Sequence, residues 1–360
     1  MSTVAEAAAA RAAATAGPEP VTFAKALTTA MADAMRADDG VVVFGEDVAK
    51  LGGVFRVTDG LMAEFGELRC FDTPLAESGI VGMALGMAMN GLRPVVEMQF
   101  DAFAYPAFEQ IASHVAKMHN RTRGRVTVPM VIRVPYAGGI GGVEHHCDSS
   151  EAYYAHTPGL KVFTPSSVAD AYRLLREAIA CDDPVVFMEP KKLYWSKDAV
   201  DLEALRAEYD SAFGGTGSGG TVSPKAAGRA AVVRPGTDAT IIAYGPAVPP
   251  ALAAAEAASA EGRSVEVVDL RTIVPFDDET VCESVRKTGR AVVVAEAQGF
   301  ASVASEITAR VQERCFHSLA APVRRVTGFD IPFPPPKFEH WYLPGVDRIL
   351  DTLDELQWED

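Results

Sequence analysis

One acidic residue stands where a loop leads into a run of small and apolar residues with helical spacing. Residues 72–80 read Asp-Thr-Pro-Leu-Ala-Glu-Ser-Gly-Ile, so a proline-containing loop delivers Glu77 to the first turn of a helix. A first-turn acid commonly complements the helix dipole, which is the simplest interpretation of Glu77. However, glycines recur at positions 79, 82, 86 and 91. Repeated glycines weaken a helix and indicate that a backbone approaches closely, so something packs tightly here and Glu77 is the leading candidate for a functional residue.

A second polar group follows a glycine-rich segment at residues 138–142. Gly-Gly-Ile-Gly-Gly is followed by Val-Glu-His-His-Cys-Asp-Ser at 143–149. The segment lacks the GxGxxG and GxxxxGK[ST] spacings of phosphate-binding loops, so a mobile turn is the simplest interpretation. His145, His146 and His156 could bind a metal, but adjacent histidine side chains diverge and no CxxC or HExxH motif accompanies them. A metal site is therefore not favoured.

Two further charged groups have simple explanations. Glu46 and Asp47 follow the first predicted strand, at the edge where α/β proteins place their sites, although an ordinary strand-end turn explains them equally well. The arginines of residues 121–125 form a short basic run, for which a solvated or interface loop is favoured. The chain carries 33 Lys and Arg against 48 Asp and Glu, a net charge of -15, which disfavours nucleic acid and anionic membranes as partners.

The elements that position these residues alternate as in an α/β protein. Apolar runs at 41–45, 94–98, 128–134 and 184–188 predict strands, and residues 23–36, 79–90, 103–118 and 168–181 predict helices between them. This pattern is typical of a buried, mostly parallel sheet, and we place the first domain at residues 21–205. Strands at 239–243, 264–270 and 291–295 with helices at 247–260 and 301–314 predict a second, smaller α/β domain at 229–360. The Pro-rich residues 332–336 predict an extended segment packed on a surface.

The remaining segments and the composition complete this organisation. Residues 1–20 are expected to be a disordered tail that resembles no secretory signal, and residues 206–228 a Gly/Ser-rich linker. Five scattered cysteines in 360 residues suggest neither a disulfide framework nor a zinc knuckle, which favours a cytoplasmic location. No stretch reaches the roughly 18 apolar residues that a membrane span needs.

Several motifs in fixed order resemble the β subunits of the E1 components of 2-oxo acid dehydrogenases. The resemblance covers residues 21–344 and implies a thiamine-diphosphate-binding domain of the pyrimidine type, joined to a transketolase C-terminal-type domain in an α2β2 heterotetramer. The chain lacks a GDG motif followed by an Asn pair, so Mg²⁺ and the diphosphate would be held by the α subunit. The motifs are residues 44–48, 52–60, 71–82, 97–100, 106–111, 151–161, 268–272 and 287–290.

The resemblance also assigns roles to the residues of the first group. Glu77 matches the glutamate that hydrogen-bonds the aminopyrimidine ring of thiamine diphosphate. Leu75, Gln99 and Phe103 match positions that line the pyrimidine pocket, although the family usually has tyrosine where this chain has Phe103. Glu46 is expected to belong to the same cofactor site.

A second catalytic role is implied for His146. It matches the histidine of a His-Ser-Gln-Ser pattern, which resembles a proton donor during acylation of the lipoyl group. Here the pattern reads His-Cys-Asp-Ser at 146–149. We expect Asp148, if it is close, to raise the pKa of His146.

Some relatives in this family bind a structural potassium ion. Its carbonyl ligands would correspond to residues near Met130, Val131 and Ala178. At the apparent position of the acidic ligand this chain has Cys181, which argues against potassium here.

The implied function is oxidative decarboxylation of a 2-oxo acid, followed by reductive acylation of a lipoyl group on an E2 protein that docks on the C-terminal domain. Some segments look closer to branched-chain enzymes than to pyruvate enzymes, so a branched-chain substrate is favoured and pyruvate stays open. A homodimeric transketolase or synthase is disfavoured because the diphosphate domain is missing. A non-catalytic assembly subunit is disfavoured because Glu77, Gln99 and His146 occur together.

Overall fold

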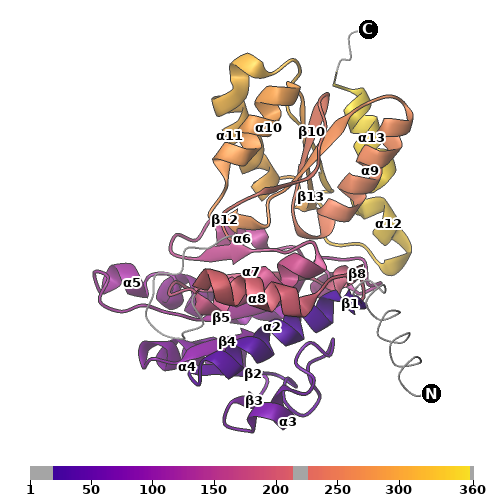
Figure 1. The fold of residues 1–360 in the computed structure, drawn as a ribbon. Coiled ribbons are helices and arrows are strands. Elements are labelled where there is room, and N and C mark those ends of the chain that lie inside the picture. The colour runs from indigo at the N-terminus through magenta and orange to yellow at the C-terminus, as the bar shows by residue number, and fades with distance from the viewer. Residues whose placement is uncertain (1–18, 214–225, 357–360) are drawn as a thin grey trace, which may run out of the picture.

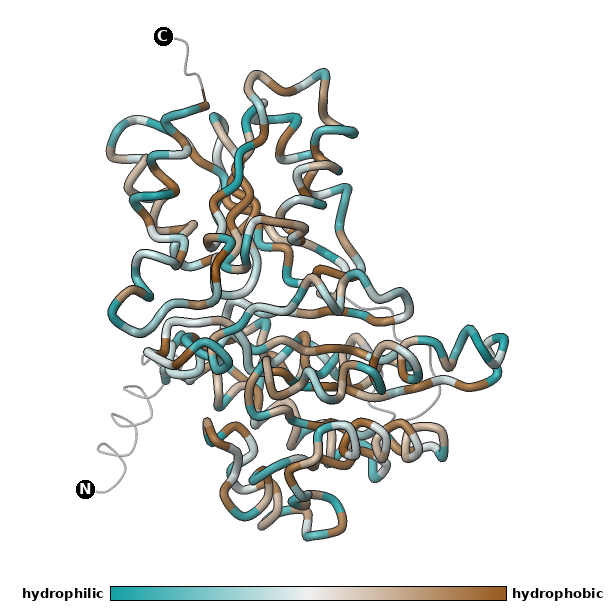
Figure 2. Tube along the Cα trace, turned by 180° about the vertical axis from the view of Figure 1, so that it is seen from behind, coloured by the Kyte–Doolittle hydropathy of each residue, from teal (hydrophilic) through white to brown (hydrophobic). Residues whose placement is uncertain are grey.

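The computed structural model describes residues 19–213 and 226–356 (Figure 1). We refer to these two ranges as the N-terminal and C-terminal domains. A seven-stranded sheet with the order β12-β6-β7-β5-β4-β2-β3 forms the centre of the first, and a five-stranded sheet with the order β14-β13-β10-β11-β9 forms the centre of the second. Hydrophobic residues gather in the interior of both domains (Figure 2). The predicted α/β class is confirmed.

The N-terminal sheet is parallel except at one edge, where β12 joins it antiparallel. Helices α2 (Phe23–Ala37) and α7 (Val168–Ala180) pack on one face, and α4 (Glu77–Met89) packs on the other. Because both faces are covered, the strands are almost continuously apolar, which explains why the sequence revealed them. The strands are β2 (Val41–Gly45), β3 (Cys70–Asp72), β4 (Arg93–Glu97), β5 (Val131–Tyr136), β6 (Lys161–Phe163) and β7 (Val185–Pro190).

The C-terminal sheet is also mostly parallel, and β9 is its only antiparallel strand among the described residues. Its strands are β9 (Ala231–Arg234), β10 (Ala239–Ala243), β11 (Val265–Asp269), β13 (Ala291–Gln298) and β14 (Arg324–Gly328). The helices around it are α9 (Val248–Ala260), α10 (Asp278–Thr288), α11 (Val303–Cys315), α12 (Glu339–Tyr342) and α13 (Val346–Asp354).

The two domains share a core. Strand β12 (Thr272–Val274) leaves the C-terminal domain and pairs with β6, so it forms the edge of the N-terminal sheet. The Tyr244 hydroxyl at the end of β10 donates to the buried Glu151 carboxylate at 2.8 Å. One continuous cluster of buried apolar residues contains side chains of both domains, so the domains are packed as one body.

Three predicted segments differ from the structure. The helix predicted at 103–118 is divided into a 3₁₀ helix (Ala102–Ala107), a π-helix (Gln110–Val115) and the short α5 (Met118–Arg121). Pro106 lies inside the first part, where it has no amide hydrogen to donate to a regular helix. Pro20, placed in the tail, begins strand β1 (Pro20–Thr22), which pairs with β8 (Lys197–Ala199).

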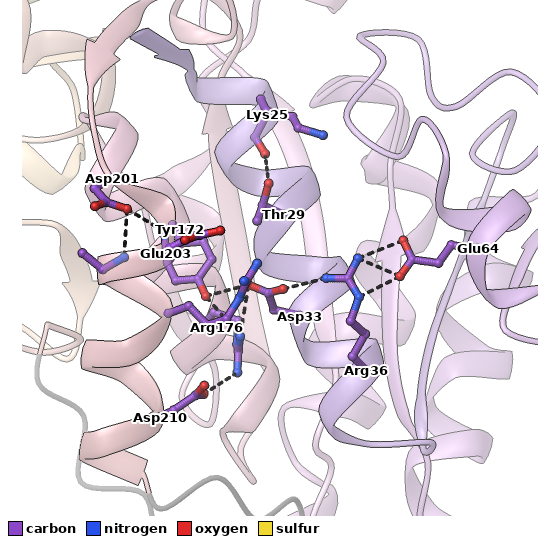
Figure 3. A network of polar contacts seen from close by, with 12 residues as sticks. Lys25, Thr29, Asp33, Arg36, Glu64, Tyr172, Arg176, Asp201, Glu203 and Asp210 are labelled. Atoms are coloured by element: carbon purple, nitrogen blue, oxygen red, sulfur yellow. Dashed lines mark hydrogen bonds and ion pairs between the residues drawn. The ribbon is translucent and has the colours of Figure 1, made fainter. Parts of the chain in front are cut away.

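The third difference lies in the predicted linker, because residues 206–213 are the end of helix α8 (Leu202–Phe213). Arg206 Nε donates to the buried Asp33 carboxylate at 2.8 Å, and Arg173 on α7 bonds Glu208 at 2.8 Å. Asp33 also bonds Tyr172 and Arg36 in the same polar network (Figure 3). These ion pairs attach α8 to α2 and α7. Residues 214–225 of the linker and 1–18 of the tail lie outside the described residues.

A buried ion-pair cluster joins three adjacent strands of the N-terminal sheet. Arg133 on β5 donates to both oxygens of Glu189 on β7 at 2.7 and 2.8 Å, and to Glu97 on β4 at 2.5 Å. The Tyr194 hydroxyl also donates to Glu189 at 2.7 Å. All four side chains are buried, so the two carboxylates depend on this arginine for charge compensation.

Arg133→Met should therefore lower the free energy of unfolding by about 3–5 kcal/mol, because it leaves two buried carboxyl groups without their cation. Denaturant unfolding of the variant and the wild type measures the difference. Arg125→Met, at an exposed arginine, is the matched control and should change stability by less than about 0.5 kcal/mol. Equal effects of the two substitutions would show that the buried cluster has no special importance.

Candidate active site

Glu77 is the first residue of α4, and it lies beside the carboxyl end of β2. Ala76 is the N-cap residue and has no side chain that could cap the helix. The preceding loop is anchored by Asp72, whose carboxylate accepts from the Ala49 amide at 2.7 Å. Glu77 itself is half-buried. The chain thus leaves this carboxylate accessible at the edge of the sheet.

Glu46 follows β2, is only 3% exposed, and lies close enough to Glu77 to be affected by its charge. Burial, and next the charge of Glu77, raise the pKa of Glu46 to about 7, while a hydrogen bond from the Ala76 amide opposes the shift. Its Oε1 has no hydrogen-bond partner among the described residues. A buried carboxyl oxygen without a partner is costly, so this site suits a bound group that brings a hydrogen-bond donor.

Gln99 lies at the same edge of the sheet as Glu46 and Glu77. It follows β4, the neighbour of β2, and its Nε2 donates to Asp47 Oδ2 at 3.1 Å. The structure therefore gathers Glu46, Glu77 and Gln99 at the carboxyl ends of adjacent strands, where open α/β sheets bind ligands. Leu75 is 78% exposed on the loop before α4, so its apolar side chain faces away from this chain.

Phe103 and His146 form a second group next to the first. The His146 ring lies edge-on to Phe100 and Phe103, with centroid distances of 4.4 and 5.3 Å. Phe100 directly follows Gln99 in sequence. The hydroxyl of Ser78, next to Glu77, bonds the Pro106 carbonyl, which fastens the start of α4 to the segment that carries Phe103.

The predicted effect of Asp148 on His146 is wrong. The pKa of His146 is lowered, first by burial and then by the charges of His145 and Lys191, with only Glu144 opposing. The Asp148 carboxylate instead accepts from the Tyr105 hydroxyl at 3.1 Å. The Nδ1 atom of His146 is buried without a partner among the described residues.

Two buried residues close to His146 escaped the sequence analysis. Lys191 is 1% exposed, its Nζ has no hydrogen-bond partner among the described residues, and it lies 5.9 Å from the Phe100 ring centroid. Burial lowers its pKa to about 8 and raises that of Asp101 to about 7. Asp101 accepts from the Ser150 amide at 2.9 Å. Asp101 lies just beyond β4 and Lys191 just beyond β7. These positions could have identified both residues from the sequence, because ligands bind at the carboxyl ends of strands in α/β folds.

A side-chain cation lies beside Cys181, which stands at the apparent position of the acidic potassium ligand. Lys161 Nζ lies 3.0 Å from Cys181 Sγ and 3.0 Å from Asp183 Oδ2. The Met130 carbonyl accepts from the Val185 amide at 3.0 Å, and the Ala178 carbonyl accepts from the Cys181 amide at 3.3 Å. Across the described ranges, no group of three His, Cys, Asp or Glu residues could hold a metal ion.

Comparison with known families agrees with this architecture. Residues 19–196 match the transketolase pyrimidine-binding domain, and residues 228–349 match the transketolase C-terminal domain. A solved split-gene transketolase, described as an inactive β4 tetramer, superposes with a TM-score of 0.70 at 22% identity, covering 93% of this chain and 98% of that one. These matches confirm the predicted fold class. No helix in the described ranges is long and apolar enough to span a membrane.

Curated relatives are similar over nearly the full chain. The pyruvate dehydrogenase E1 component subunit beta of Leifsonia xyli is 52% identical, covering 96% of this chain and 98% of that protein. The 3-methyl-2-oxobutanoate dehydrogenase subunit beta of Mycobacterium tuberculosis is 48% identical over 94% and 92%. The pyruvate dehydrogenase E1 component subunit beta of Bacillus subtilis is 45% identical over 92% and 97%.

Proposed function

The chain belongs to the E1 β subunits of 2-oxo acid dehydrogenases. We propose that it supplies the residues that hold and transfer a proton in a thiamine diphosphate site shared with an α subunit. The observation that carries the proposal is the pair formed by Glu77 and the buried Glu46 at the carboxyl end of β2. Two adjacent carboxyl groups in different environments are the usual means of holding a proton near neutral pH.

The residues at this edge fit the pyrimidine end of the cofactor. Glu77 would hold a ring nitrogen through a shared proton, with Gln99 and the exposed Leu75 beside the ring. Thiamine diphosphate, when bound, supplies the carbon nucleophile and the electron sink that decarboxylation of a 2-oxo acid requires. While Glu46 is protonated it carries no negative charge, so it does not repel the carboxylate of Glu77. The family's tyrosine hydroxyl is absent at Phe103, so that position offers packing only.

The glycines of α4 support an α subunit as the partner. A Cβ on Gly86 would meet no atom within 4 Å, and one on Gly82 would meet only Gln110 at 3.7 Å. Met83 and Met89 on the same helix are 39% and 45% exposed. These glycines therefore leave room on α4 for the close approach of another chain. We place the α subunit here in an α2β2 heterotetramer, with Mg²⁺ and the diphosphate on α.

His146 would act in the second half of the reaction. Reductive acylation breaks the disulfide of a lipoyl group, so that one sulfur takes the acyl group and the other needs a proton. His146 packs against Phe100, the residue after Gln99, so it lies beside the proposed pyrimidine site. From there it can deliver this proton. The acceptor would be an E2 protein docked on the C-terminal domain.

For the substrate, we propose pyruvate, with 3-methyl-2-oxobutanoate as the second candidate. The 52% identical relative is named for pyruvate and a 48% identical one for the branched-chain acid, so the preference for a branched-chain substrate is not supported over pyruvate. One or two methyl groups change binding in an apolar pocket by only about 1–3 kcal/mol, and part of the pocket would belong to α.

The decisive experiment assays the purified α/β complex with both acids in parallel, using an artificial electron acceptor. We expect kcat/KM to be at least about tenfold higher for pyruvate, the ratio that 1.4 kcal/mol of discrimination gives. The reverse ratio would establish the branched-chain activity instead. Turnover of neither acid by an assembled complex would contradict the proposed function.

A further inference from the structure

The glycine-rich loop that leads to His146 is held by two carboxylates of the C-terminal domain. The Gly138 amide donates to Glu296 on β13. The Gly139 amide donates to Glu339 Oε1 at 2.6 Å, and the Gly141 amide to Glu339 Oε2 at 3.2 Å. Glu339 is the first residue of α12. Three amides of one loop thus depend on the other domain.

Close contacts explain why this loop is rich in glycine. A Cβ on Gly138 would lie 2.3 Å from Phe333 Cζ, and a Cβ on Gly139 would lie 2.8 Å from Lys192 Cδ. Gly139 and Gly141 have φ angles of +86° and +68°, which glycine adopts readily. These contacts and backbone angles favour a loop of one conformation over the mobile turn that composition alone suggested.

The Pro-rich segment at residues 332–336 also contacts this glycine-rich loop. Phe333, within residues 332–336, is 4% exposed and packs against Cys147 and Tyr342. It reaches Gly138 from the C-terminal domain. Residues 332–335 form neither helix nor strand, Pro336 begins a 3₁₀ helix, and Phe333 places a buried aromatic ring between the domains.

The negative charges of Glu296 and Glu339 strengthen their hydrogen bonds to the loop amides. Hydrogen bonds from amides to carboxylates are roughly twice as strong as neutral ones. Glu296 is 3% exposed, and Lys192 Nζ lies 3.7 Å from its Oε2. His146 follows Gly141 by five residues, in the short 3₁₀ helix Glu144–His146. A shift at the glycines would therefore move the histidine relative to Phe100 and Phe103.

We propose that Glu339 and Glu296 are positioning residues, which fix the place of His146 in the active site through the backbone amides of Gly138, Gly139 and Gly141. The inference rests on the proposed function of His146. It assigns the C-terminal domain a part in the chemistry of the N-terminal domain, because the two carboxylates bond the loop that leads to His146.

The test compares Glu339→Ala, Glu339→Gln and the control Glu313→Ala in the assembled α/β complex. Glu313 is exposed on α11 and lies outside these contacts. Glu339→Ala should lower lipoyl acylation about tenfold, and decarboxylation less, because a small misplacement of a reacting group is costly. Glu339→Gln keeps one acceptor oxygen and should recover part of the rate. In a His146→Ala background, Glu339→Ala should add no further loss.

Hydrogen–deuterium exchange of the loop amides provides a readout that does not depend on activity. We expect faster exchange at Gly139 and Gly141 in Glu339→Ala, and at Gly138 in Glu296→Ala. Unchanged exchange at Gly139 and Gly141 would overturn the contact itself. Faster exchange with full acylation would overturn the positioning role, as would an additive loss in the His146→Ala background. Normal acylation by His146→Ala alone would instead refute the proposed function of His146, and exchange would then decide on the contact.

Discussion

Glu77→Gln in the α/β complex should lower decarboxylation of the 2-oxo acid by about 10²–10⁴-fold, the usual contribution of a positioned acid–base group. Glutamine has nearly the same shape, so the start of α4 and the contact with the α subunit should be preserved. It cannot share a transferable proton with a ring nitrogen. The rate with an artificial electron acceptor measures this loss, and size-exclusion chromatography verifies assembly.

The buried neighbour of Glu77 gives this experiment a second readout. The charge of Glu77 is the second cause of the raised pKa of Glu46, after burial. Removing that charge should lower the pKa of Glu46, so the carboxyl group titrates at a lower pH in the variant. Glu109→Gln is the matched control, because the Glu109 side chain is 62% exposed. Near wild-type turnover by Glu77→Gln would exclude the proposed role.

Local patterns were sufficient to predict much of the fold, whereas the roles of the candidate site residues stay predictions. The apolar runs at 41–45 and 239–243 coincide with β2 and β10, because strands covered on both faces admit few polar residues. Glu46 and Glu77 lie at the ends of predicted elements, so the sequence already placed both acids at the edge of the sheet where the structure has them. The break at Pro106 was also present in the sequence, but periodicity alone favoured one long helix.

The contacts between domains could not be predicted in this way. Gly138 and Glu296 are 158 residues apart in sequence, and no local pattern records which carboxylate will face which amide. The glycine cluster gave the composition of a turn, whereas its conformation depends on Phe333 and Lys192 from other segments. Lys191 was missed for a similar reason, since a lysine after a strand is usually solvated and its burial becomes visible only when both domains are packed.

The second large effect is expected at His146, and it should separate the two halves of the reaction. His146→Ala should lower lipoyl acylation by about 10²-fold, in the range for loss of a general acid, and decarboxylation much less. The physical reason is that opening the lipoyl disulfide requires a proton at sulfur, whereas loss of carbon dioxide does not. Acylation is measured with a lipoyl domain, and decarboxylation with an artificial acceptor.

The matched control for this prediction is the adjacent His145→Ala. The His145 ring lies tilted against His146 with a centroid distance of 4.5 Å, but its side chain is 49% exposed. Removing it also removes one of the charges that lower the pKa of His146, so the pH dependence of acylation should move to higher pH with a small change in rate. Equal losses in both half-reactions for His146→Ala would show that His146 supports the whole site. A selective loss of acylation, together with the shifted pH profile of His145→Ala, would place proton delivery on His146.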